Sequence, residues 1–415
     1  MSAPAPIPLS PEDRAILDLE CATVAGHACK VVLLEGPGPG MEELRWAIGE
    51  RIGAAPELTR RLVDADGAPA WAPDEGFDVA DHVVALTVAA PLDRMGLRRE
   101  VARLFAERLD RSRPLWRIDV APLAGGGRAL VWRTHHALAD GTTAMRLADA
   151  VLWDPRPDRE DARASAAAAD RGRRRRLRGF LRRELGPAAG RSPFDGTIGG
   201  AREVAFASMP LGPLHDAARA ACGATVNDAV LCAVAGGIRR WLVARGGELG
   251  TLRVRVPVSL HHEGDDAGNR DSFFSVGVPL GEPDAVERLR AVSAATAARK
   301  AAADAETMDR LMHDLARVSP ALEGFAERLE ASPREFAVAV SNVVGPRSPV
   351  TVRGAPVTHL YSLAEIGQRH ALRVGAVSLA GTLSLGLCAD PELVEDVQAM
   401  AEGAEAEART LIAAA

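Results

Sequence analysis

Hydrophobic patterning along the first 153 residues is typical of a mixed α/β unit. Short apolar runs, which favour strands, alternate with segments in which apolar residues recur every three or four positions, which favour helices. The predicted strands are Cys29–Leu34, His82–Val88, Leu115–Ala121 and Arg128–Thr134, and the predicted helices are Met41–Ile52 and Leu97–Leu109. Because the last two strands flank three consecutive glycines, Gly125 to Gly127, we expect a turn between them.

The second half of the chain shows the same alternation. Thr225 and Asp228 stand at the two positions of a helix capping box, and an apolar face follows them at helical spacing. Further predicted strands are Leu252–Leu260, Ser272–Leu280, Glu335–Val343, Thr358–Ser362, Ala371–Leu379 and Thr382–Leu387, and further helices are Ala285–Ala302, Thr307–Leu329 and Glu392–Ile412. A chain of 415 residues with this pattern predicts an α/β protein of more than one domain.

A basic segment separates the two predicted units. Pro155–Arg191 holds 12 Arg against five acidic residues, a local net charge of +7, whereas the whole chain carries −6 and the rest of it −13. We therefore divide the chain into residues 1–154, a linker at 155–195 and residues 196–415. Within the linker, residues 171–185 predict a basic helix with a narrow apolar stripe. Two interpretations stay open, a solvated connector or docking to an anionic membrane or lipid-droplet surface.

Composition narrows the class of protein further. The net negative charge argues against nucleic-acid binding. The five cysteines are odd in number and form no C-x-x-C pair, which argues against a disulfide framework or a zinc ribbon. The N-terminus lacks the signal-peptide pattern, and no apolar run reaches the ~18 residues of a membrane helix. We therefore expect a cytoplasmic protein. All of its 50 cationic side chains except Lys30 and Lys300 are arginines.

The candidate chemistry lies in the segment from Thr134 to Gly141, which follows a predicted strand and precedes a predicted helix. Its adjacent histidines, His135 and His136, point in different directions, so one can face a substrate while the other packs. A histidine there can act as a general base, since its ordinary pKa of ~6.5 leaves it largely neutral near pH 7. Asp140 can bond an imidazole or an arginine, and Gly141 allows a tight turn into the helix.

Other interpretations of the histidine pair are less well supported. A zinc site needs three suitably spaced ligands, and the H-E-x-x-H pattern is absent. A serine hydrolase needs a nucleophile elbow, and the sequence has no G-x-S-x-G. A purely structural pair of histidines stays open on this segment alone.

Several segments resemble the bacterial wax ester synthase/diacylglycerol acyltransferase family. His135, His136, Asp140 and Gly141 match its H-H-x-x-x-D-G motif. The other matching segments, in the family's order, are Pro114-Leu115-Trp116 (P-L-W), Asn227-Asp228 (N-D), Gly268-Asn269-Arg270 (G-N-R) and Ser341-Asn342-Val343-Val344-Gly345-Pro346 (S-N-V-P-G-P). They are spread over nearly the whole chain.

The resemblance implies an α/β, two-domain fold like that of chloramphenicol acetyltransferase, with mixed sheets and a substrate channel between the domains. It implies an acyl-CoA-dependent O-acyltransferase with acyl-CoA as a substrate and no bound cofactor or metal. His136 is then the general base, with no acyl-enzyme, and Asn269 donates to the oxyanion. Asp140 holds the loop by pairing with an arginine. Substrate contacts are implied for Pro114, Leu115, Trp116, Asn227, Asp228, Ser341, Asn342 and Gly345.

Some positions depart from the family pattern. Leu260-His261-His262 stands where the family usually has an arginine, and Val344 replaces the first proline of S-N-V-P-G-P. The expected acceptor is diacylglycerol or a long-chain alcohol. Two alternatives stay open: an acyltransferase of the same fold that serves secondary metabolism with a smaller or carrier-bound substrate, and a non-catalytic binding protein. Asn342 and Gly345 fit an ordinary strand-end turn as well as a channel wall.

Overall fold

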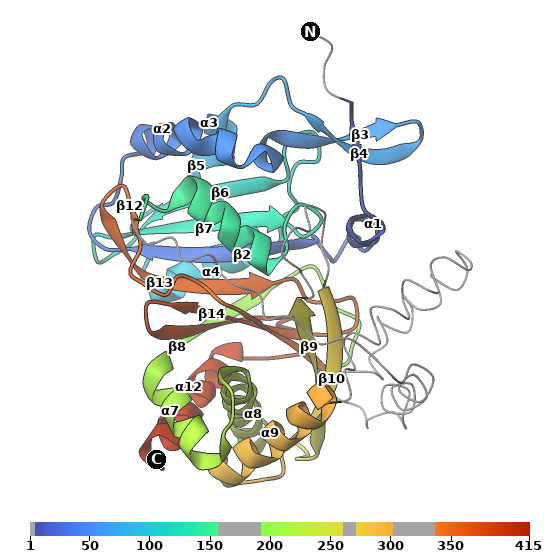
Figure 1. Ribbon diagram of the computed structural model, residues 1–415, viewed down its shortest axis with the longest axis vertical. Helices are drawn as coiled ribbons and strands as arrows, with labels where there is room; N and C mark the ends of the chain where they lie inside the picture. Colours follow the sequence, from blue (N-terminus) through green and yellow to red (C-terminus); the bar gives the residue numbers. More distant parts are fainter. Residues whose placement is uncertain (1–4, 157–191, 260–270, 302–336) are drawn as a thin grey trace.

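Two six-stranded sheets form the centre of the computed structural model, which describes residues 5–156, 192–259, 271–301 and 337–415 (Figure 1). The first sheet has the order β12 (Thr351–Val352), β13 (Ala355–Ala364), β2 (His27–Leu34), β7 (Arg128–His135), β6 (Trp116–Pro122) and β5 (Val83–Ala85). The second has the order β10 (Asp271–Pro279), β9 (Thr251–Ser259), β11 (Val338–Val343), β14 (Leu372–Leu379), β15 (Thr382–Ala389) and β8 (Glu203–Pro210).

Strands β2 and β7 are the centre of the first sheet. They pair antiparallel, with His27 opposite His135 and Lys30 opposite Trp132. Both strands are buried along nearly their whole length, because helices α2 (Met41–Arg51) and α5 (Gly141–Leu147) contribute to the core on one face and α4 (Arg94–Ala106) to the core on the other. A strand covered on both faces has an apolar run without alternation, which is the pattern of both segments.

A small sheet extends from the first one. It has the order β1 (Ile7–Pro8), β4 (Ala68–Pro73) and β3 (Arg60–Ala65), and the hairpin of β3 and β4 projects to one side in Figure 1. Helices α1 (Pro11–Asp18) and α3 (Val79–His82) and two 3₁₀ turns, Ile52–Ala54 and Pro56–Thr59, complete this half of the molecule.

The second sheet is mixed, because β11 runs parallel to β9 and β14 while the other pairs are antiparallel. Helices α7 (Leu211–Cys222), α8 (Val226–Ala244), α9 (Ala285–Ala301) and α12 (Val397–Ala413) gather beside it (Figure 1). The predicted capping box is confirmed at the start of α8. Helix α12 crosses α8 where a side chain on Gly237 would overlap the carbonyl oxygen of Met400, so this close contact requires glycine.

The two sheets meet at Ser362 of β13. A methyl group on Gly375 of β14 would lie 2.6 Å from the Ser362 carbonyl oxygen, and one on Gly386 of β15 would overlap the same oxygen. These two glycines, which face each other on paired strands, therefore allow the backbone of β13 to come close to the second sheet. Strands β12 and β13 belong to residues 196–415, yet β13 pairs with β2 of the first half, so strand pairing crosses the predicted division of the chain.

Most predicted elements that fall within the described residues are confirmed, with ends shifted by a few residues. The prediction of a strand over His82–Val88 is largely wrong: only Val83–Ala85 is a strand, and His82 ends α3 with its ring stacked on Trp116. The predicted helix at Glu392 begins only at Val397. The predicted helix at Thr307–Leu329 lies outside the described residues. Helices α1 and α7 and strands β1, β3, β4 and β8 had no prediction.

Over the residues that the structure describes, no helix by itself combines the length and the hydropathy needed to cross a membrane. Helices α7 and α8 meet that test only when they are taken together, and they are bent by 96° relative to each other.

Candidate active site

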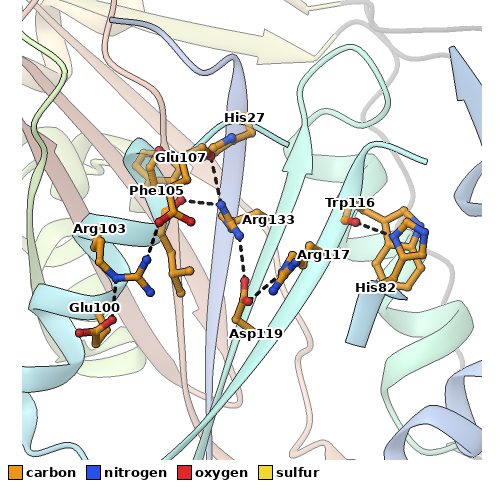
Figure 2. A network of polar contacts seen from close by, with 11 residues as sticks. His27, His82, Glu100, Arg103, Phe105, Glu107, Trp116, Arg117, Asp119 and Arg133 are labelled. Carbon is orange, nitrogen blue, oxygen red and sulfur yellow. Dashed lines mark hydrogen bonds and ion pairs between the residues drawn. The ribbon is translucent and has the colours of Figure 1, made fainter. Parts of the chain in front are cut away.

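The strand that carries the two histidines is fixed by a buried ion pair. Arg133 of β7 contacts Asp119 of β6 (Nη2 to Oδ2, 2.9 Å) and also donates to the carbonyl oxygens of Leu104 and Glu107 at the end of α4 (Figure 2). A cation is favourable there because the carbonyl end of a helix is negative. The His27 ring donates to the carbonyl oxygen of Phe105 (Figure 2), which further ties the strands to α4.

His135 is fully enclosed, at 1% exposure. Its Nδ1 accepts a hydrogen bond from the backbone N–H of Ala137 (3.1 Å), so the proton of the neutral ring is on Nε2. Nε2 donates that proton to Oε1 of Glu20 at 2.6 Å. Both ring nitrogens are therefore engaged, and this histidine positions the loop.

Glu20 and Gly26 complete the surroundings of His135. The other carboxylate oxygen of Glu20 contacts Arg111 at 2.6 Å. Partial burial acts to raise the pKa of Glu20, but the hydrogen bonds from His135 and Arg111 and the positive charge of Arg111 outweigh it, and the pKa is lowered. Gly26 has φ +72°, and a methyl group there would lie 2.7 Å from His135 Nε2. Its carbonyl oxygen accepts the backbone N–H of His136 (2.9 Å).

His136 is only half-buried, unlike its neighbour. Its pKa is lowered to about 4, first by burial and then by the charge of Arg373, while Asp140 acts in the opposite direction and Lys30 adds a smaller lowering. Burial and nearby cations both disfavour the imidazolium ion. The ring is therefore neutral at pH 7, which is the state that accepts a proton from a hydroxyl group.

Asp140 holds the loop by capping α5. Its Oδ1 accepts the backbone N–H of Thr143 at 2.6 Å, the N-cap arrangement that satisfies the first turn of a helix. Gly141, the first residue of α5, lies against β11, since a methyl group on it would stand 2.7 Å from Cγ2 of Val343. The H-H-x-x-x-D-G segment and the Ser341–Pro346 turn are thus in contact, although 200 residues separate them in sequence.

The Ser341–Pro346 segment comprises the last three residues of β11 and the turn after them, and it lies against strand β14. Ser341 and Asn342 are half-buried and lie opposite Gly375 and Ala376 of β14. The backbone N–H of Gly345 donates to Oγ of Ser378 (3.1 Å), and a side chain on Gly345 would overlap the Ser378 carbonyl oxygen. A glycine is therefore required at this position by the close approach of two backbones.

The Pro114-Leu115-Trp116 segment supports the histidines through its backbone. The carbonyl oxygen of Leu115 accepts the N–H of His135 (2.9 Å). The Trp116 ring is buried, donates to the carbonyl oxygen of Leu58 (2.7 Å) and stacks on His82 (Figure 2). The indole N–H of Trp116 therefore has its hydrogen-bond partner inside the core of the first half.

Both carboxylate oxygens of Asp228 are engaged in hydrogen bonds within the second half. One carboxylate oxygen accepts the N–H of Thr225 (2.8 Å) in the capping box, and the other accepts the hydroxyl of Thr296 on α9 (2.6 Å). The neighbouring Asn227 is half-buried in the first turn of α8. Asp228 therefore joins two helices of the second half.

Some predicted residues lie outside the described ranges. These are Asn269 with its neighbours Gly268 and Arg270, His261 and His262, and the basic segment 171–185. Other residues of the site had no sequence prediction. Glu20, Gly26 and Arg373 belong to no recognisable motif, and Lys30 stood out only as one of two lysines.

Comparison with known proteins agrees with this geometry. Residues 9–186 match the family model described as the wax ester synthase/diacylglycerol acyltransferase catalytic domain, and residues 267–411 match the model described as the WS/DGAT C-terminal domain. The chain is 28% identical, over 92% of its length and 90% of the relative's, to the protein named probable diacylglycerol O-acyltransferase tgs1 of Mycobacterium tuberculosis.

Solved structures share the fold. The wax ester synthase/diacylglycerol acyltransferase from Marinobacter aquaeolei VT8 superposes with a TM-score of 0.72 at 24% identity, covering 98% of both chains. The first condensation domain of the calcium-dependent antibiotic synthetase superposes with a TM-score of 0.63 at 19% identity, covering 99% of this chain and 96% of that one. The expected two-domain acyltransferase fold is therefore confirmed.

Proposed function

This chain belongs to the wax ester synthase/diacylglycerol acyltransferase family, and from that premise we propose that it transfers a fatty acyl group from acyl-CoA to a hydroxyl group of diacylglycerol or of a long-chain alcohol. The chain is an acyltransferase. The observation that carries the proposal for its chemistry is the state of His136, a half-buried histidine at a strand end whose pKa is lowered to about 4. No bound cofactor is required, since acyl-CoA is itself the donor substrate.

In the proposed mechanism, His136 removes the proton of the acceptor hydroxyl as its oxygen adds to the thioester carbon. The C–S bond then breaks, the ester leaves, and the proton passes from His136 to the sulfur of coenzyme A. Direct transfer needs no acyl-enzyme. A positioned general base of this kind contributes typically ~10²–10⁴-fold to the rate.

Two further groups complete the proposed site. Asn269 is the donor to the oxyanion of the tetrahedral intermediate, a role that rests on its place in the G-N-R segment. Loss of one such donor typically costs ~10²–10³-fold in kcat, so we expect N269A to lose that much; an unchanged kcat would remove Asn269 from the site. Ser341, Asn342 and Gly345 form part of the channel wall, which the contact of their neighbour Val343 with Gly141 supports.

The substrate assay uses one labelled long-chain acyl-CoA with four acceptors in parallel: diacylglycerol, a long-chain alcohol, a short alcohol and none. We expect labelled ester with diacylglycerol or the long-chain alcohol, with one free coenzyme A per ester. Ester from the short alcohol alone favours the same-fold alternative of secondary metabolism, and no ester at all favours a binding protein. Intact-mass measurement after incubation without acceptor checks the mechanism, since an acylated protein would contradict direct transfer.

We also propose that residues 171–185 touch an anionic membrane or lipid-droplet surface. The support is the local charge of +7 together with apolar residues at helical spacing in the sequence. Binding to anionic liposomes should weaken with salt and should weaken again when Arg173, Arg174, Arg175 and Arg176 are replaced by glutamine. Equal binding of the two proteins would favour a plain connector.

A further inference from the structure

Lys30 is a buried lysine in the middle of the first sheet. It lies on β2 with 3% exposure, and its Nζ donates to Oγ of Ser362 at 2.7 Å. The only other lysine, Lys300, is exposed on α9. A buried ammonium group costs considerable free energy unless charges and hydrogen bonds compensate it.

Strand register determines which face Lys30 occupies. It stands between Ser362 of β13 and Trp132 of β7, and directly opposed residues of antiparallel strands point to the same side of a sheet. Trp132 packs in the same core cluster as Ala139 and Met145, which lie on either side of the start of α5. The Lys30 side chain is thus on the face of the sheet that carries the loop from His136 to Asp140.

The charges near Lys30 come from the candidate active site. Burial lowers its pKa to about 8, against the attraction of the Asp140 carboxylate. In the other direction, Lys30 is one of the groups that disfavour a proton on His136. Four groups interact electrostatically with His136: Lys30 from β2, Arg373 from β14, His135 at the end of β7, and Asp140 at the cap of α5.

We propose that Lys30 is a positioning residue of the acyl-transfer site, whose ammonium group is held by Ser362 on the face of the sheet that carries the loop from His136 to Asp140, and attracts the carboxylate that caps α5. This inference rests on the proposed function of His136 as the base. Lys30 and Arg373 come from different halves of the chain, so cations from both halves act on the proposed base. A neutral residue at position 30 leaves the backbone cap of Asp140 in place but removes one of the two cations.

The first test measures the protonation of His136 directly, by NMR titration of the histidine ring nitrogens in the full chain. The signal of His136 is assigned by its loss in H136N. In K30M and K30Q we expect its pKa to rise above about 4 but to stay below the ordinary histidine value of ~6.5, because burial and Arg373 still disfavour the proton. K30R keeps the charge and should keep the low pKa, and the exposed-site control K300M should leave it unchanged. An unchanged pKa in a folded K30M or K30Q variant would overturn the inference.

The second test follows catalysis in the same variants, after circular dichroism has confirmed their folding. The acid limb of kcat/KM should move to higher pH in K30M and K30Q and stay in place in K30R and K300M. A loss of rate in K30M with the acid limb unmoved would make Lys30 a purely structural residue. Absence of acyl transfer by the wild-type protein would count against the proposed function, whereas the NMR titration would still decide the role of Lys30.

Discussion

Two adjacent histidines differ completely in what surrounds them. His135 has both ring nitrogens engaged, one by the N–H of Ala137 and one by Glu20, and is shut off from solvent. His136 keeps part of its surface exposed and is neutral at pH 7, because its pKa is lowered to about 4. The first histidine therefore fixes the backbone, and the second is the one that we propose as the base.

The lowered pKa makes a prediction for the pH profile. In the proposed mechanism the neutral form of His136 is the active base, and this form persists down to its pKa of about 4. Below neutral pH, kcat/KM should therefore fall as pH drops through about 4, and not through the ordinary histidine value of ~6.5. Steady-state rates from pH 3.5 to 8, with circular dichroism at each pH as a control for acid unfolding, check this. A limb near the ordinary value in folded protein would contradict it.

Gly26 offers a prediction with a matched control. Gly26→Ala forces a left-handed residue to carry a side chain, at a cost of about 1–2 kcal/mol, and also places a methyl group against His135 and Glu20. Gly36 has a similar φ of +69° but open space around it, so Gly36→Ala should lose only the backbone cost. Urea unfolding should show the larger loss for G26A, with a lower kcat. Equal losses would mean that the His135 pocket tolerates the methyl group.

The sequence identifies the candidate residues of the motif better than the residues that support them. The H-H-x-x-x-D-G spacing led to His135, His136, Asp140 and Gly141, since those residues are contiguous. Glu20 gives no such signal, because it reaches His135 only when the end of α1 folds back over β7. The substrate contacts expected of Trp116 and Asp228 stay predictions, and in the structure their polar atoms bind Leu58, Thr225 and Thr296.

Helix α5 and strand β11 form the contact that joins the H-H-x-x-x-D-G segment to the Ser341–Pro346 segment. Gly141→Ala would press a methyl group on Cγ2 of Val343, and such overpacking costs typically ~1–3 kcal/mol. We expect G141A to lower kcat/KM by moving the loop that carries His136. The double variant G141A/V343A removes the opposing methyl groups and should recover much of the loss. Failure of the second substitution to restore any activity would show that the contact is not the cause.

Single elements were predictable where their pattern is local. Strands β2, β6, β7, β9 and β10 and helix α8 follow from apolar runs, turns and a capping box within one segment. Strand β5 is shorter than predicted, and His82 belongs to the helix before it. The His82 ring stacks on Trp116, which lies 34 positions further along the chain, so the local sequence gives no sign of this contact. Nor could the sequence indicate that β13 leaves its own half to pair with β2, since that depends on contacts between residues over 300 positions apart.

The whole molecule depends on the close junction of its two sheets at Ser362. Gly386→Ala would place a methyl group on the Ser362 carbonyl oxygen, next to the strand that holds Lys30. We expect a loss of ~1–3 kcal/mol in the free energy of unfolding, because the added methyl group overpacks the junction between the sheets. Gly212→Ala on α7, where there is open space, is the control and should be neutral. Native stability of G386A would argue against a tight junction.

The most decisive measurement compares His136→Ala with the wild-type protein in the labelled acyl-CoA assay. His215→Ala on α7 serves as the histidine control, and circular dichroism with urea unfolding verifies that each variant is folded. We expect kcat for ester formation to fall by ~10²–10⁴-fold in H136A and to stay unchanged in H215A. Ester formation by folded H136A at the wild-type rate would show that His136 is not the base and that acyl transfer takes place by another route.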